Sequence, residues 1–181
     1  MSKRKLILIL IAIVIALIST LVRVNATDYK VLNQGDSQAC MVYAVETYID
    51  VIGATSCIGA EKAISDLGED ATDPLKVLDY YVSQGAIDSY KSLTRIRTSD
   101  FPILAITWVN EWDWVDATIT EKIYNYNILH ASVLLSRESG YLYGINSWGD
   151  AWGFNGHYKL YNTKAITYAY ILTVPEAVIW N

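Results

Sequence analysis

A short polar loop, residues 33–39, leads Cys40 into an amphipathic run, and this stretch constrains the fold more than any other part of the chain. In the run, which ends at Ile52, apolar side chains recur at helical spacing on one face, at positions 41, 44, 45, 48, 49 and 52. Glu46, Thr47 and Asp50 fall on the opposite, polar face. We therefore expect a helix that begins at Cys40 and packs its apolar face against a core.

Cys40 lies where a helix can activate a thiol. Unpaired N–H groups and the positive end of the dipole at a helix N-terminus favour the thiolate. The alternative is a small buried cysteine that only fills space, which is a common use of free cysteine. The loop and the helix leave both interpretations open.

The first 26 residues have the pattern of a secretory leader. A basic segment at 2–5 precedes an apolar segment at 6–18, and small residues follow at 24–26. The alternative is an uncleaved signal anchor that uses residues 6–22, near the lower length limit of about 17 residues for a membrane span. Both versions place the remaining domain, 27–181, outside the cytoplasm, either secreted or anchored to the membrane.

The charge balance excludes some partners. The full chain has 14 basic and 19 acidic side chains and a net charge of −5. Removal of the leader takes away Lys3, Arg4, Lys5 and Arg23 and no acid, which leaves 10 basic and 19 acidic side chains and a charge of −9. Nucleic acids and anionic membrane surfaces are unsuited as partners because both require clustered Lys and Arg. A membrane contact would come only from the leader, if it is retained.

Local patterns divide the rest of the chain into a helical half, 27–95, and a mainly β half, 96–181. We expect a short helix at 60–67. Residues 73–85 predict a further helix, because Asp73 suits the N-cap, Pro74 the first turn and Gly85 the position after the end. From 101 onward the segments are short, β-branched and aromatic, as in strands. No linker long enough to separate two independent domains interrupts the chain.

The two cysteines could form a disulfide outside the cytoplasm. A helix that starts at Cys40 carries Ile52 about 18 Å away, and the five residues up to Cys57 would have to run almost straight back. We therefore expect Cys40 to be unbridged and Cys57 to be a free or buried thiol.

The only histidines are His130 and His157. Strand-like runs at 128–135 and 141–146 flank a turn-forming segment, which predicts a hairpin. With the turn centred near Glu138, His130 and Asn146 lie directly opposite each other on one face, so the amide could hold one imidazole nitrogen while the other faces a thiol. A slip of one residue would separate them onto opposite faces. The alternative is a strand histidine satisfied by solvent or by a backbone carbonyl.

The segment 146–158 is rich in glycine and aromatic residues. By itself this composition is typical of a loop that covers a core. Trp148, two residues after Asn146, could however shield an Asn–His hydrogen bond from water and so strengthen it.

Three motifs, in this order, resemble the papain-like cysteine proteases. They are Gln34-Gly35 with Cys40 six residues after the glutamine, Leu129-His130-Ala131, and Asn146-Ser147-Trp148-Gly149 with Trp152-Gly153 and Gly156. Asp28-Tyr29-Lys30 resembles the start of the mature family domain. The resemblance therefore covers residues 28–174.

The resemblance implies an α+β, papain-like fold of two lobes: an N-terminal helical lobe, 27–95, with the nucleophile helix, and a C-terminal antiparallel β-barrel-like lobe, 96–181. It implies that Cys40 is the nucleophile, paired as a thiolate with the His130 imidazolium. Asn146 would orient the imidazole and Trp148 would cover that bond. Gln34 would complete the oxyanion hole with the backbone N–H of Cys40, while His157 would be structural.

The implied activity is that of a secreted or surface-anchored cysteine peptidase, acting on protein or peptide substrates as a monomer without cofactor or metal. The chain also departs from the family pattern. Ser37 stands where the family usually has a cysteine, and Ala39 and Met41 flank the nucleophile in place of Ser and Trp. Cys40 and His130 are 90 residues apart, against about 130 or more expected for papain and cathepsins, and no inhibitory pro-segment precedes Asp28.

Two alternatives remain open from the sequence. One is a non-catalytic binding protein with the papain fold, suggested by the shortened lobes and by aromatic residues such as Trp108, Trp112 and Trp114. The other is a different chemistry at the same residues, such as transpeptidation or cleavage of cell-wall amides.

Overall fold

The computed structural model describes residues 29–56, 58–109, 118–119, 128–161 and 163–175. The expected leader, Cys57 and the tryptophans at 112 and 114 lie outside these ranges. None of the helices within the described ranges is long and apolar enough to cross a membrane.

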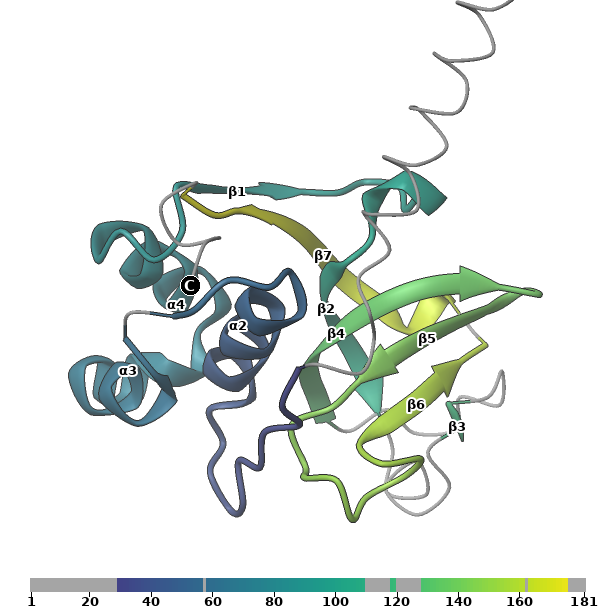
Figure 1. Cartoon of the computed structure of the whole chain (residues 1–181), viewed down its shortest axis with the longest axis horizontal. Helices are drawn as coiled ribbons and strands as arrows, with labels where there is room; N and C mark the ends of the chain where they lie inside the picture. The colour runs from purple at the N-terminus through teal and green to yellow at the C-terminus, as the bar shows by residue number, and fades with distance from the viewer. Residues whose placement is uncertain (1–28, 57, 110–117, 120–127, 162, 176–181) are drawn as a thin grey trace, which may run out of the picture.

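Among the described residues, three α-helices gather on one side of the molecule (Figure 1). They are α2 (Cys40–Val51), α3 (Ala60–Leu67) and α4 (Pro74–Ser83), with the 3-10 helix η1 (Gly68–Thr72) between the last two. The side chain of Asp73 caps α4 by accepting the N–H groups of Leu75 and Lys76. The helices expected at 41–52, 60–67 and 73–85 are confirmed.

The strands form one sheet in the order β1-β7-β2-β4-β5-β6-β3. Their bounds are β1 (Ser89–Ser92), β2 (Ile103–Val109), β3 (Thr118–Ile119), β4 (Ile128–Glu138), β5 (Tyr141–Ile145), β6 (His157–Leu160) and β7 (Ile166–Thr173). The short 3-10 helices η2 (Thr98–Asp100) and η3 (Thr163–Ala165) lie on the connections before β2 and β7. All neighbours are antiparallel except β3 and β6, which run parallel. The α+β expectation is confirmed, although β1 lies in the half that was predicted to be helical.

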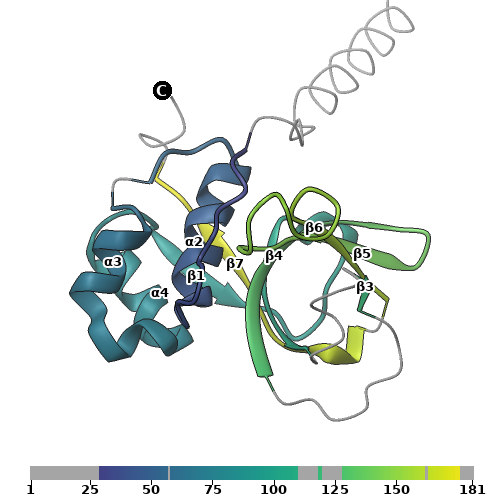
Figure 2. The ribbon, with the colours of Figure 1, turned by 90° about the horizontal axis from the view of Figure 1, so that it is seen from below.

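The sheet separates two cores. In Figure 2 its strands curl around an interior on one face, while the helices cover the other. Strand β2 serves both cores because successive side chains alternate between faces. Leu104 and Ile106 pack in the core under the helices, whereas Ile103 and Ala105 pack inside the curl.

Helix α2 is buried almost all round, which corrects the expectation of a polar outer face. Glu46 is only 8% exposed and Thr47 only 2%, because α3 and α4 cover the side of α2 that faces away from β4. The Glu46 carboxylate accepts hydrogen bonds from the Tyr81 hydroxyl at 2.5 Å and from the Ser56 hydroxyl at 2.9 Å. Burial raises the pKa of Glu46, against the opposing effect of these two donors.

The predicted register of the β4–β5 hairpin is wrong. The turn is the two-residue loop Ser139-Gly140, and the first pair above it is Glu138 with Tyr141. After an irregularity at Leu135, the pairing continues with Leu134 opposite Gly144. His130 therefore does not face Asn146 across this pair of strands, and its direct partner is Thr107 of β2.

Candidate active site

His130 and Asn146 form a hydrogen bond in spite of the different register. The His130 Nε2 atom lies 2.6 Å from Asn146 Oδ1. The backbone N–H of Ser147 also donates to Oδ1, at 2.7 Å, so this atom is the carbonyl oxygen of the amide. Since Oδ1 can only accept, Nε2 carries the proton and Nδ1 of the neutral ring is left as a base.

The irregularity at Leu135 explains how these two side chains meet. One extra residue in β4 changes which residues of the two strands share a face. Continued past Ile145, the observed pairing sets Asn146 opposite Ser132, two residues from His130 and on the same face. Without the extra residue the two side chains would lie on opposite faces of the sheet.

Aromatic rings enclose the His130–Asn146 pair. The Trp148 ring lies 4.5 Å from the imidazole, centroid to centroid, and Trp152 packs edge-on against Trp148 at 4.9 Å. His130 is 6% exposed and Asn146 is 3% exposed. A hydrogen bond in such a dry surrounding is stronger than one in water.

A second polar pair lines the same small cavity as the imidazole. The hydroxyls of Ser132 and Tyr158 are 2.6 Å apart, and burial raises the pKa of Tyr158 to about 12. The Tyr158 ring fits because residue 144 is glycine: a Cβ there would lie 2.5 Å from the ring. This pair of hydroxyls is therefore uncharged at neutral pH.

Cys40 begins α2 beside the strand that carries His130, and it forms no disulfide. The backbone N–H of Ala131 donates to its Sγ at 3.4 Å. Burial raises the pKa of the thiol, while the N–H groups of Ala131, Met41 and Cys40 itself act in the opposite direction. The backbone donors expected at the helix start are thus present, but desolvation outweighs them.

The pKa shifts of Cys40 and His130 both oppose the thiolate–imidazolium pair that the resemblance implies. Burial lowers the pKa of His130 to about 4, although the hydrogen bond to Asn146 raises it. Among the hydrogen bonds between described residues, none joins Cys40 to His130. Both shifts favour the neutral thiol and the neutral imidazole.

Gln34 is held at the edge of the same site. Its Nε2 donates to the carbonyl of Ser37 at 2.7 Å, and its Oε1 accepts from the Ser147 hydroxyl at 2.5 Å. Its backbone N–H bonds the Ser147 carbonyl, also at 2.7 Å. The amide has two N–H hydrogens, so one of them has no acceptor within the described part of the chain.

Sequence reasoning missed the role of Ser147. This residue ties Gln34 through its hydroxyl and carbonyl, and it ties Asn146 through its N–H. Its place between Asn146 and Trp148 was the only available signal. His157, expected to be structural, starts β6 opposite Ile145, and its side chain bonds elsewhere, with Nε2 at 2.7 Å from the Tyr29 hydroxyl and Nδ1 at 2.8 Å from the Asn155 carbonyl.

The site therefore combines a thiol at a helix start, a base with a fixed tautomer and a held amide. These are the parts required for nucleophilic attack on a carbonyl. Within the described ranges, no group of three or more His, Cys, Asp or Glu side chains could hold a metal ion.

Comparisons with known proteins identify the fold. The sequence matches no protein-family model and no curated protein. Bromelain from Ananas comosus, solved with the inhibitor E64, superposes with a TM-score of 0.64 at 15% identity, over 82% of this chain and 94% of its own. A cysteine protease from Carica candamarcensis, solved with E-64, gives 0.65 at 13% identity, over 82% and 94%.

A third solved structure is digestive procathepsin L2 proteinase from the larval midgut of Tenebrio molitor. It gives a TM-score of 0.65 at 14% identity, covering 81% of this chain and 65% of the procathepsin chain. All three neighbours are cysteine proteases of the papain type. The chain thus has a papain-like α+β fold, as expected from its motifs.

Proposed function

We propose that the chain is a cysteine-type peptidase that hydrolyses peptide bonds with Cys40, His130 and Asn146. The observation that carries the proposal is the hydrogen bond between His130 and Asn146, which fixes the proton on Nε2 and leaves Nδ1 as a base. The fold of the solved neighbours supports the same function.

In the proposed reaction, His130 Nδ1 takes the proton of the thiol while Cys40 Sγ attacks the substrate carbonyl. The backbone N–H of Cys40 and the second amide hydrogen of Gln34 stabilise the oxyanion. His130 then gives the proton to the leaving amine, and the C–N bond breaks to leave a thioester. Water, deprotonated by the same imidazole, hydrolyses the thioester and frees the thiol.

The proposed reaction starts from a Cys40 thiol and a His130 imidazole that are both neutral. Catalytic hydrogen bonds are often long in a free enzyme and shorten when substrate binds. We propose that the thiol–imidazole contact forms in the substrate complex, where the developing charges stabilise each other.

A non-catalytic papain-fold protein is the second candidate, and one observation favours it. No hydrogen bond joins Cys40 and His130 among the described residues, and the pKa of the thiol is raised while that of the imidazole is lowered. A binding protein could keep both groups in this neutral state.

Covalent labelling separates the two candidates. The solved plant neighbours are complexes with E-64, an epoxysuccinyl inhibitor, so this compound is the probe. We expect intact-mass analysis at pH 5–7 to show one adduct per chain, localised to Cys40 by peptide mapping. Cys40→Ala should abolish the adduct, and Cys57→Ala should retain it. An unlabelled wild-type protein with a cooperative unfolding transition would instead support the binding protein.

Asn146→Ala tests the orienting bond separately. The change removes the acceptor of the imidazole proton and of the Ser147 N–H, so both tautomers of the ring become accessible. We expect kcat/KM for a peptide substrate to fall about 10- to 100-fold, with kcat bearing most of the loss, whereas Cys40→Ala abolishes turnover. Equal activity of Asn146→Ala and wild type would contradict the proposed role. Product analysis with added amines distinguishes hydrolysis from transpeptidation.

We also propose that the peptidase acts outside the cytoplasm as a monomer, either secreted or anchored through residues 6–22. The basic and apolar pattern of the leader supports this location.

A further inference from the structure

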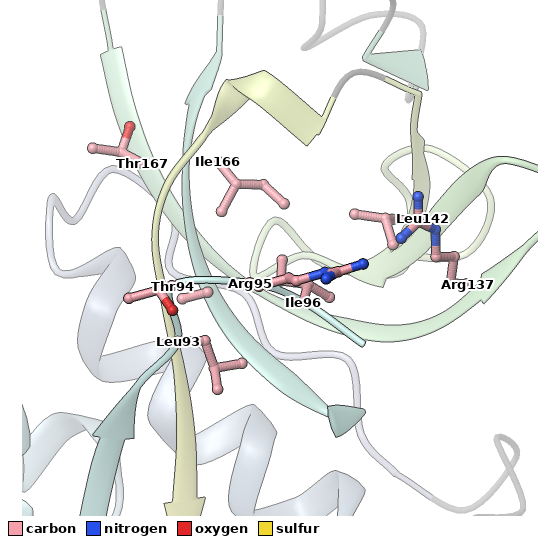
Figure 3. Close-up of a pocket in the computed structure, with 9 residues that line it drawn as sticks. Leu93, Thr94, Arg95, Ile96, Arg137, Leu142, Ile166 and Thr167 are labelled. Carbon is pink, nitrogen blue, oxygen red and sulfur yellow. The ribbon is translucent and has the colours of Figure 1, made fainter. Parts of the chain in front are cut away.

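A pocket of about 570 Å³ lies at the turn end of the β4–β5 hairpin, away from the candidate active site. Its walls come from the segment after β1, from the ends of β4 and β5, and from β7 (Figure 3). Arg137 lines the pocket and lies seven residues after His130 on β4, which corresponds to about 23 Å at 3.3 Å per strand residue. A ligand here would not contact the imidazole.

The charge in this pocket is unbalanced. Arg95 and Arg137 line it, and no Asp or Glu does. Neither guanidinium takes part in an ion pair or a side-chain hydrogen bond with another described residue. The salt bridge found among the described residues joins Lys62 and Asp66 instead. In Figure 3 both guanidinium groups extend toward the same space. Two converging cations favour an anion between them, against the net charge of −5 of the whole chain.

Part of the pocket lining is apolar. Leu93, Ile96 and Ile166 are partly buried there and Leu142 is buried. Leu142 belongs to the core inside the curled sheet and the other three side chains pack against that core, so all four are held in place by packing. A ligand with a short aliphatic part could replace water on this surface, with a gain in free energy for each buried methylene.

We propose that this pocket binds a small amphiphilic anion: a carboxylate or phosphate group between Arg95 and Arg137, with a short aliphatic chain against Leu93, Ile96, Leu142 and Ile166. Guanidinium groups recognise both oxyanions through paired N–H donors. The volume lies within the range of about 300–1,000 Å³ that is typical of small-molecule sites. The inference does not depend on the proposed peptidase activity.

Isothermal titration calorimetry of the full-length chain tests the ligand class. The probes are hexanoate, hexyl phosphate, hexanamide and inorganic phosphate, which separate the anion from the aliphatic chain. We expect saturable 1:1 binding of hexanoate or hexyl phosphate, whichever oxyanion the pocket prefers. Hexanamide and inorganic phosphate should each bind at least tenfold more weakly. Equal affinity for hexanoate and hexanamide, or no saturable binding of either amphiphilic anion, would overturn the proposal.

Arginine variants locate the binding. Arg95→Gln and Arg137→Gln should each lower the affinity for the preferred anion about tenfold or more. Arg97→Gln is the matched control: this exposed arginine lies two residues from Arg95 but does not line the pocket. It makes the same charge change and should leave the affinity within twofold of wild type. An equal loss in Arg95→Gln and Arg97→Gln would show a general charge effect and contradict the assigned site.

Cys40→Ala separates the pocket from the catalytic proposal. Binding of the anion should be unchanged in this variant, because Cys40 lies on α2 and does not line the pocket. Loss of binding in Cys40→Ala would place the ligand near the thiol and contradict the inference. Failure of E-64 labelling with retained anion binding would reject the peptidase and leave this site standing.

Discussion

At the scale of single residues, the most unusual groups are buried side chains that can carry charge. His130 and Glu46 are both under 10% exposed, at 6% and 8%, and each has directed hydrogen bonds. Desolvation shifts the pKa of each toward its neutral form, lower for His130 and higher for Glu46. Their protonation is therefore linked to folding.

The shift of His130 predicts a loss of stability in mild acid. Its pKa is about 4 in the folded chain against 6.5 for an ordinary histidine. Between these values the unfolded chain binds a proton that the folded chain does not, so the free energy of unfolding falls as the pH drops. The contribution is fully present above pH 6.5, and the loss by about pH 4 is on the order of 3 kcal/mol.

Urea unfolding at pH 7 and pH 4.5 measures this effect, with His130→Gln as the control. Glu46 acts in the opposite direction, because a raised carboxyl pKa favours the folded state at lower pH. The informative quantity is therefore the difference between wild type and His130→Gln. If this difference is the same at both pH values, the imidazole is not held in its neutral form by folding.

Tyr81→Phe tests the Glu46 cluster. The variant keeps the ring but removes the hydroxyl that donates to Glu46 at 2.5 Å. Removing the donor of a buried acceptor lowers the free energy of unfolding by about 1–3 kcal/mol. Tyr90→Phe is the matched control, because the Tyr90 hydroxyl donates to Asp79 at an exposed position, and it should cost under about 0.5 kcal/mol. Chemical denaturation of both variants provides the measurement, and equal costs would contradict the importance of burial.

At the scale of elements, the β4–β5 hairpin controls the geometry of the site. Its turn places Ser139 at φ 50° and Gly140 at φ 86°, the pattern of a type I′ turn. The extra residue at Leu135 then sets which face His130 shares with Asn146. The turn and the irregularity lie apart, so the turn can be altered without moving the site.

Ser139→Asn should stabilise the hairpin. Asparagine followed by glycine is the preferred pair for this turn, since asparagine accepts a positive φ more readily than serine does. We expect about 0.5 kcal/mol of added stability, or a rise of roughly 1–2 °C in Tm. Calorimetry measures the rise, and the catalytic properties should not change. Ser139→Val should lower Tm, because a β-branched residue is strained at this φ; a rise in both variants would contradict the turn assignment.

Local signals explain which elements the sequence predicted. The bounds of α4 follow from Asp73, Pro74 and Gly85, because each of these residues acts on the helix end next to it. By contrast, β1 has a mostly exposed, polar sequence, Ser89–Ser92, and exists through its pairing with β7, about 80 residues away. The hairpin register depended on an extra residue at Leu135, for which the sequence provides no local mark. The motif found His130 and Asn146, but only the fold revealed Ser147.

At the scale of the whole molecule, the expected export of the chain can be tested directly. Expression in a host with a secretory pathway should release a protein whose N-terminus, by Edman or mass analysis, falls near residue 27. Retention of the intact chain in the membrane fraction would indicate the signal anchor. Replacement of Lys3, Arg4 and Lys5 by Glu should reduce export in either case. An intact wild-type chain in the soluble cytosol would contradict both.

The hydrogen bond between Gln34 and Ser147 bears on when the site can form during synthesis. It joins segments 113 residues apart in the sequence, next to a backbone bridge between Asn33 and Trp148. Such distant contacts form late, because the entropy of closing a long loop opposes them. The ribosome releases Cys40 well before Asn146 and Ser147, so a growing chain holds a thiol without its oriented base. Any activity of this site thus begins only after Asn146 and Ser147 have been synthesised.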